Sequence, residues 1–329
     1  MEKRIDYIDY LKGLSVIWVV WYHTEHPAFV DYSFRIPLFF FVSGIFFKAY
    51  PWNVFWRKKI NQLVIPFVLF YLLYYFFLNF LNYLKFKTFN AFDYSSFWGI
   101  FQLYSGYESF VINPPLWFIC ALFNLNLILY LMIRIIKDNR IILFVSFLLS
   151  LFGIIYIKDL STYFMFGRSV PFLIYYVIGY IFGKSLLNHL DSNREEFKIL
   201  LISLILFSFI GIVKYFLHIK LVWIELLNYF QIISLVLLLI VLFKHIYIFS
   251  LCYPFKYFGV NSYIVLGIHE IYHTSFRIII ENTLGSMSIA LGILQTLLTL
   301  FLLWPTIYLF NKYIPSLVAK KDMIIVPKL

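Results

Sequence analysis

Long apolar runs recur from one end of the chain to the other and leave little sequence between them. Helical runs of about 17 to 25 apolar residues match the thickness of the hydrocarbon core of a membrane. With 63% hydrophobic and only 13% charged residues among 329, the chain has more apolar surface than a soluble domain of this size can bury. The sequence therefore predicts an all-α fold, a polytopic transmembrane helical bundle formed by a single domain over 1–329.

About ten segments are apolar and long enough to be spans: 8–23, 34–48, 62–83, 115–136, 140–157, 169–187, 198–216, 222–243, 259–280 and 288–311. An even number places both termini on one side. Lys12 and Arg277 lie within spans and are not assigned to a side. Of the other 25 lysines and arginines, only seven lie in or beside the loops on the side opposite to the termini: Arg35, Lys85, Lys87, Lys158, Arg168, Lys214 and Lys220. Because cationic loops remain in the cytoplasm, we expect cytoplasmic termini and an outer loop at 84–114.

The excess of lysine and arginine on the predicted cytoplasmic side explains the net charge of +11. We therefore expect membrane lipid, and no nucleic acid, as a partner. The cysteines, Cys120 and Cys252, lie in or beside apolar segments without ligand spacing and are interpreted as small core residues. Glu225 and Gln231 are polar inside the eighth predicted span, and the sequence assigns them no role.

The first span carries an ionisable group at each end of the apolar stretch Gly13–Trp21. Lys12 and His23 are eleven residues apart, which is close to three helical turns, so they share a face and lie ~16 Å apart along the axis. Ionisable groups at membrane depth usually face a bundle interior or a wet cavity. Alternatively, Lys12 reaches the cytoplasmic surface and His23 lies among the opposite headgroups.

The string DYLKGLSVIWVVWYH, Asp9 to His23, resembles the first helix of the membrane-bound acyltransferase 3 family, in which a basic residue, ten further residues and a histidine follow one another. Most members have arginine as the basic residue. A lysine at this position, as in Lys12, resembles the branch of the family that is similar to fucose 4-O-acetylase. The resemblance implies O-acetylation of sugars in cell-surface polysaccharides with acetyl-CoA as donor. It implies His23 as the catalytic residue and Lys12 as a contact of coenzyme A.

Two later segments continue the resemblance. RIPLFFFVSGIFF, Arg35 to Phe47, looks like the second-helix signature of the family, and Ser43 would then line the reaction chamber. Its Ser-Gly pair also permits close helix packing, which is compatible with that role. NPPLWFICALF, Asn113 to Phe123, is similar to the opening of the fourth helix in the fucose acetylase-like branch. Trp117 is either an interface anchor or an apolar wall for a sugar ring.

Further cations fall where the family has basic residues. Arg57, Lys58 and Lys59 precede the proline that opens the third span, and the resemblance implies that this cluster holds the phosphates of coenzyme A. An ordinary cytoplasmic anchor would explain the same charges. Arg168, before an aromatic span, either meets an acidic or phosphate-bearing acceptor or caps the span.

The ninth span concentrates ionisable groups. His269, His273 and Arg277 recur every four residues and share one helix face, with Glu270 beside them. So many ionisable groups in one span indicate function. The family pattern of serine and then histidine seven residues later fits Ser262 and His269, and the resemblance makes His269 a chamber residue.

The pentapeptide HEIYH, His269 to His273, also matches the H-E-x-x-H motif of zinc proteases, in which two histidines bind the metal and the glutamate activates water. Such a site needs a third ligand, and no second motif in another apolar span supplies one. An intramembrane zinc protease therefore ranks below acyl transfer, and we expect no metal cofactor.

The resemblance as a whole implies a membrane O-acetyltransferase of the bacterial cytoplasmic membrane. Its acceptor would be a sugar of a surface glycan or of a lipid-linked precursor, and other glycan-assembly proteins would be its partners. His23 would act as general base, for which a neutral imidazole is suited at physiological pH. A glycan or lipid transporter or flippase is the alternative, although transport gives no reason for pairing Lys12 and His23 with the 57–59 cluster.

Overall fold

The computed structural model describes residues 5–24, 34–88, 94–102, 113–157, 162–216, 221–247, 252–286 and 288–327. Every secondary-structure element in this part of the chain is helical, which confirms the all-α prediction. Much of the predicted outer loop 84–114 lies outside the described residues, as do five of the cations that entered the comparison of the two sides: Lys3, Arg4, Lys158, Lys220 and Lys328.

Seven helical stretches are long and apolar enough to cross a membrane, so the chain is a multi-pass membrane protein. They are α3 with α4 (Trp52–Lys59, Ile65–Phe86), α6 (Trp117–Ile135), α7 (Asn139–Phe152), α8 with α9 (Phe166–Ser169, Leu173–His189), α10 (Asn193–Phe216), α11 (Leu221–Ile246) and α14 (Ile289–Tyr313). The remaining helices are α1 (Asp6–Tyr22), α2 (Arg35–Ile45), α5 (Tyr94–Gln102), α12 (Tyr253–Val260) and α13 (Ser262–Leu284).

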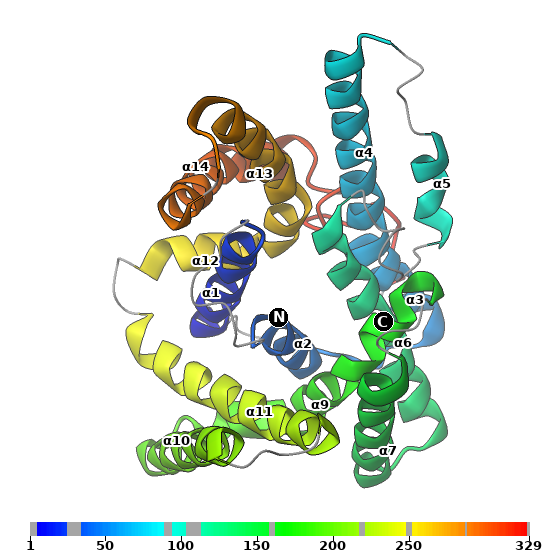
Figure 1. Cartoon of the computed structure of the whole chain (residues 1–329). Coiled ribbons are helices and arrows are strands. Elements are labelled where there is room, and N and C mark those ends of the chain that lie inside the picture. The colour runs from blue at the N-terminus through cyan, green and yellow to red at the C-terminus, as the bar shows by residue number, and fades with distance from the viewer. Residues whose placement is uncertain are drawn as a thin grey trace.

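All of the predicted spans coincide with helices, but three of them, on α1, α2 and α13, fall outside the seven. The helices α1 and α2 have only 17 and 11 residues, and α13 carries the histidines and acids of the ninth segment. Figure 1 shows α1 and α2 in the middle of the molecule, with α7, α10 and α14 at its edge. The short or polar helices are therefore sheltered by the long apolar ones.

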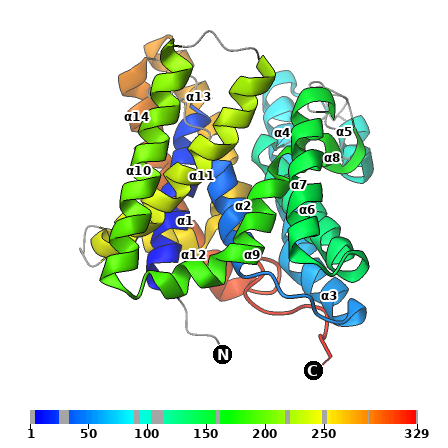
Figure 2. The same ribbon diagram turned by 90° about the horizontal axis from the view of Figure 1, so that it is seen from below.

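The described chain begins in α1 and ends after α14 at the same side of the bundle (Figure 2). This placement agrees with an even number of crossings. The number of crossings, and the cytoplasmic side of both ends, stay predictions from the charge pattern.

The position of α1 depends on glycines at its crossing with α12. A β-carbon added to Gly13 would lie 1.8 Å from the carbonyl oxygen of Phe255, and one added to Gly259 would lie 1.9 Å from the carbonyl oxygen of Asp9. The two backbones are therefore in direct contact, as small residues allow between helices in lipid. This contact fixes the helix that ends at His23.

A second close crossing joins α2 to α9. A β-carbon on Gly44 would lie 2.0 Å from the carbonyl oxygen of Tyr176, and one on Gly179 would lie 2.0 Å from that of Phe41. Gly44 thus provides the close helix packing that the Ser43–Gly44 pair was expected to permit. The serine is half-buried on α2.

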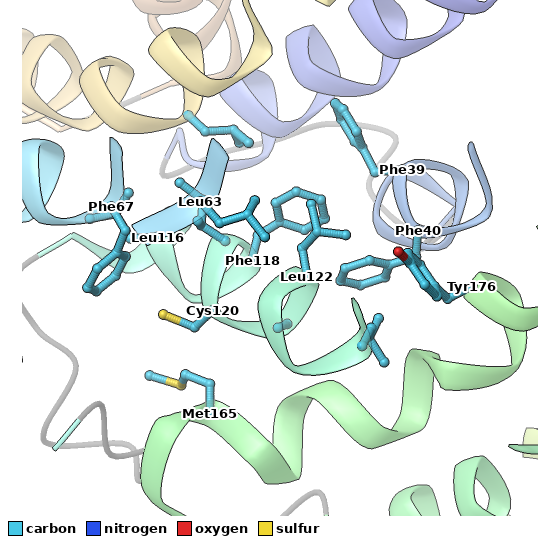
Figure 3. Packing of buried hydrophobic residues seen from close by; sticks show 14 of the residues in the cluster. Phe39, Phe40, Leu63, Phe67, Leu116, Phe118, Cys120, Leu122, Met165 and Tyr176 are labelled. Carbon is cyan, nitrogen blue, oxygen red and sulfur yellow. The ribbon is translucent and has the colours of Figure 1, made fainter. Parts of the chain in front are cut away.

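Aromatic rings fill the core between α2, α4, α6 and α9 (Figure 3). Phe40 stacks on Phe118 with ring centroids 4.8 Å apart, and the hydroxyl of Tyr176 donates a hydrogen bond to Asn126 at 2.8 Å. Cys120 lies in this cluster and is buried, whereas Cys252 is half-buried. The packing holds the N-terminal ends of α2 and α6 beside the end of α1.

Candidate active site

His23 is the first residue after α1 and caps its C-terminal end. Its backbone N–H bonds to the carbonyls of Val19 and Val20, and its side chain is 22% exposed. Nδ1 of His23 lies 3.8 Å from Oε2 of Glu270, and its ring centroid lies 5.3 Å from that of His269. Residues at opposite ends of the sequence thus form one cluster at the end of α1.

The α13 side of the cluster is buried and short of hydrogen-bond partners. Nδ1 of His269 lies 2.7 Å from the carbonyl oxygen of Val265, so Nδ1 carries the proton and Nε2 keeps its lone pair. Within the described chain, Nε2 of His269 and Oε2 of Glu270 have no hydrogen-bond partner, nor does either ring nitrogen of His273. Buried polar atoms are almost always paired in native proteins, so unpaired ones here indicate a site that binds a polar group.

A cavity of about 420 Å³ opens onto His23. Trp117 and Arg168, which the sequence predicted as chamber residues, line it together with His23. Two further cavity residues, Arg35 and Phe172, were not predicted. His23 therefore does not point into lipid away from any chamber.

Arg35 was interpreted only as an outer-side cation, and nothing in the sequence signalled its place in the site. It opens α2, and its guanidinium lies 3.8 Å from the ring centroid of Tyr22. The hydroxyl of Ser15 donates to the Arg35 carbonyl at 2.5 Å, which ties the start of α2 to α1. Ser43, in contrast, is not among the residues that line this cavity.

The predicted cofactor cations divide into two groups. Lys12 lies against the ring of Phe46 with its Nζ 5.5 Å from the centroid, and Lys59 lies against Phe47 at 5.9 Å. Lys58 lies over the ring of Tyr50 at 4.0 Å. All three lysines therefore surround the segment 46–50 that follows α2.

Arg57 points elsewhere, because its guanidinium donates to the carbonyl of Ile325 at 2.9 Å. The neighbouring side chain of Asn61 donates to the Ile324 carbonyl at 2.8 Å and accepts from the backbone N–H groups of Met323 and Ile324. These bonds hold the C-terminal segment against α3, so Arg57 is occupied by the chain itself.

His23, His269 and Glu270 could also hold a metal ion, since one potential ligand atom from each lies within 4.8 Å of the others. This set differs from the zinc-protease arrangement, in which both histidines of H-E-x-x-H bind metal and the glutamate does not. In the described residues, His273 is not part of the set. The prediction of no metal cofactor stays a prediction.

Comparison with known proteins gives a single match. A protein-family model for the acyltransferase 3 family, described as an acyltransferase domain, matches residues 5–316. No curated protein and no solved structure matches the chain.

Proposed function

Because the chain belongs to the acyltransferase 3 family, we propose that it is a bacterial O-acetyltransferase that carries an acetyl group from acetyl-CoA to a sugar hydroxyl of a surface polysaccharide or of its lipid-linked precursor. Membership makes it an acyltransferase of the membrane. The sequence pattern at Lys12, His23 and 115–118 is our basis for proposing three further points: acetyl-CoA as the donor, a glycan as the acceptor, and the fucose acetylase-like branch of the family.

The observation that carries the proposal is the pairing of His23 with Glu270 at the mouth of a cavity lined by cations. A carboxylate on one side of an imidazole stabilises the imidazolium that forms when the ring takes a proton. With Nδ1 of His23 turned toward Glu270, Nε2 is the nitrogen available as general base. The cluster thus contains the groups needed for general acid–base catalysis: an imidazole that can take up and return a proton, and a carboxylate beside it.

The reaction follows from these groups. The imidazole of His23 takes the proton of the sugar hydroxyl while the hydroxyl oxygen attacks the thioester carbonyl carbon. The carbon–sulfur bond then breaks, and the imidazolium returns its proton to the departing thiolate of coenzyme A. The guanidinium groups of Arg35 and Arg168, which line the same cavity, supply positive charge for the oxyanion of the tetrahedral intermediate.

The donor would be held at the opposite end of α1. Lys12, Lys58 and Lys59 surround one short segment there and suit the phosphates of coenzyme A, since charge-assisted hydrogen bonds to phosphate are the strong ones. Lys12 and His23 are separated by ~16 Å along the helix, a distance that an extended pantetheine arm can span. The thioester would then reach His23 from the cytoplasmic side.

Isotope-labelled acetyl-CoA tests the proposal directly. Membranes from cells that carry the gene should incorporate label into surface glycan or lipid-linked glycan, and membranes from cells without it should not. Movement of glycan across the membrane without incorporation would identify a transporter instead. Proteolysis that stops on chelation of zinc would identify the metalloprotease.

A further inference from the structure

A second polar cavity, of about 540 Å³, adjoins the one that holds His23. Trp117, Arg168 and Phe172 line both cavities, so the two cavities adjoin at these three side chains. The far wall of the second cavity comes from α10 and α11, which contribute Lys214, Glu225, Asn228 and Gln231. This wall includes the two polar residues of the eighth span to which the sequence gave no role.

The polar wall is an ordered network. Nζ of Lys214 donates to Oδ1 of Asn228 at 2.6 Å and to Oε1 of Gln231 at 2.9 Å. Nδ2 of Asn228 donates to Oε2 of Glu225 at 3.2 Å. Polar groups on membrane helices are costly, and those that line a cavity usually mark a substrate path.

Aromatic rings line the same cavity. The rings of Trp117 and Phe172 lie 5.9 Å apart between centroids, and those of Tyr175 and Tyr229 lie 5.4 Å apart. The hydroxyl of Tyr229 donates to the carbonyl of Pro171 at 2.9 Å, which orients its ring. One cavity thus combines aromatic rings with amide, ammonium and carboxylate groups.

We propose that this second cavity binds the sugar ring of the acceptor, which names the substrate site and rests on the proposed function. A pyranose has an apolar C–H face, which can lie against an aromatic ring, and hydroxyl edges that both donate and accept. Amide side chains such as Asn228 and Gln231 also do both. The bound ring then presents a hydroxyl toward His23 at the boundary formed by Trp117 and Arg168, which line both cavities.

A third cavity, of about 720 Å³, is larger but has a different lining. It lies between α4, α5, α6 and α8, and apolar side chains such as Phe67 and Leu127 line it without any charged group. An apolar chain suits that cavity and a sugar does not. Lys214 lies in the last turn of α10 and Glu225 near the start of α11. Figure 2 shows these two helix ends at the side opposite to the start of α1, which is the side toward which α1 runs.

Cysteine protection tests binding without using activity. Ile232 lines the second cavity outside the hydrogen-bond network, whereas Tyr215 is 80% exposed beside Lys214. The variants Ile232→Cys and Tyr215→Cys are labelled in membranes with a water-soluble thiol reagent, and labelling is read by peptide mass spectrometry. The probes are methyl glycosides of hexoses and 6-deoxyhexoses, with glycerol as control.

At least one methyl glycoside should slow labelling of Ile232→Cys at least ~tenfold, while glycerol should not. Labelling of Tyr215→Cys should stay unchanged, and the added substitution Gln231→Leu should remove the protection. Lack of labelling at Ile232→Cys, or no protection by any methyl glycoside in protein that acetylates its glycan, would overturn the inference. Protection without any acetyl transfer would support the sugar site and contradict the proposed function instead.

Discussion

His23 and Glu270 stand 247 positions apart in the sequence, yet Nδ1 of His23 lies 3.8 Å from Oε2 of Glu270. The contact joins the end of α1 to the buried face of α13, where Glu270 is only 7% exposed. At 3.8 Å the two groups face each other without a direct hydrogen bond, and a shorter approach during the reaction would let the carboxylate stabilise an imidazolium. The contact thus brings a carboxylate to the histidine that follows α1 and that we propose as the general base.

The variant Glu270→Gln tests this pairing, because it keeps the size of the side chain and removes its charge. We expect the rate of acetyl transfer to fall about 100-fold, with the KM for acetyl-CoA unchanged, since the loss falls on proton transfer. The matched control is Glu281→Gln, because Glu281 lies on the same helix and is exposed. Full activity in Glu270→Gln would show that the carboxylate takes no part.

The division of the cations predicts different effects for neighbouring substitutions. Lys59→Ala and Lys12→Ala should raise the KM for acetyl-CoA about tenfold or more, because each removes a charge-assisted contact to phosphate. Arg57→Ala should change that KM little and should loosen the C-terminal segment, since Arg57 donates to the Ile325 carbonyl.

Acetyl-pantetheine, which lacks the phosphates, serves as the control donor for these variants. Steady-state rates with this donor should be the same in Lys59→Ala and in the unaltered protein. An equal loss with both donors would mean that Lys59 acts on structure, and a larger KM effect in Arg57→Ala would reverse the assignment.

Local patterns were sufficient to predict the helices and several members of the site. Apolar runs gave the spans because a helix in lipid must be apolar over its length. Helical periodicity alone predicted that Lys12 and His23 share one face of the first span. The resemblance pointed to Trp117 and Arg168, which line the cavity beside His23. The seven clear spans do not include α1, α2 and α13, whose shortness or polarity goes with their place at the site.

Contacts between distant helices could not be predicted in the same way. The position of Arg35 in the cavity and the approach of Glu270 to His23 depend on how α1, α2 and α13 pack against one another, and no pattern in one segment encodes that. The same is true of Lys214, which looked like a loop cation and instead bonds to Asn228 and Gln231 in the membrane-spanning helices.

The crossing of α1 and α12 predicts a strong size limit at Gly13. Gly13→Val should lower the free energy of unfolding by about 1–3 kcal/mol, because its β-carbon would overlap the Phe255 backbone and the helices must separate. Gly211→Ala is the control, since a β-carbon there would lie 3.5 Å from Nε2 of Gln231, an ordinary contact. Thermal unfolding of both variants in detergent gives the comparison, and equal stability would contradict the close crossing.

The candidate ligand set predicts inhibition by added metal. Zn²⁺ bound to His269, Glu270 and the His23 nitrogen that faces Glu270 would leave the ring proton of His23 on Nε2, which then could not act as the base. We expect micromolar Zn²⁺ to stop acetyl transfer, EDTA to restore it, and EDTA alone to leave the purified protein fully active. A protein that loses transfer in EDTA and regains it only with added metal would require a metal mechanism.

The most direct measurement is the rate at which label passes from acetyl-CoA to glycan in purified protein that carries His23→Ala. His189→Ala is the matched control, because His189 ends α9 as His23 ends α1, and its ring is exposed and bonds only within its own helix. The account predicts a loss of about 10³-fold or more in His23→Ala and no loss in His189→Ala. Transfer by His23→Ala at the rate of the unaltered protein would contradict it.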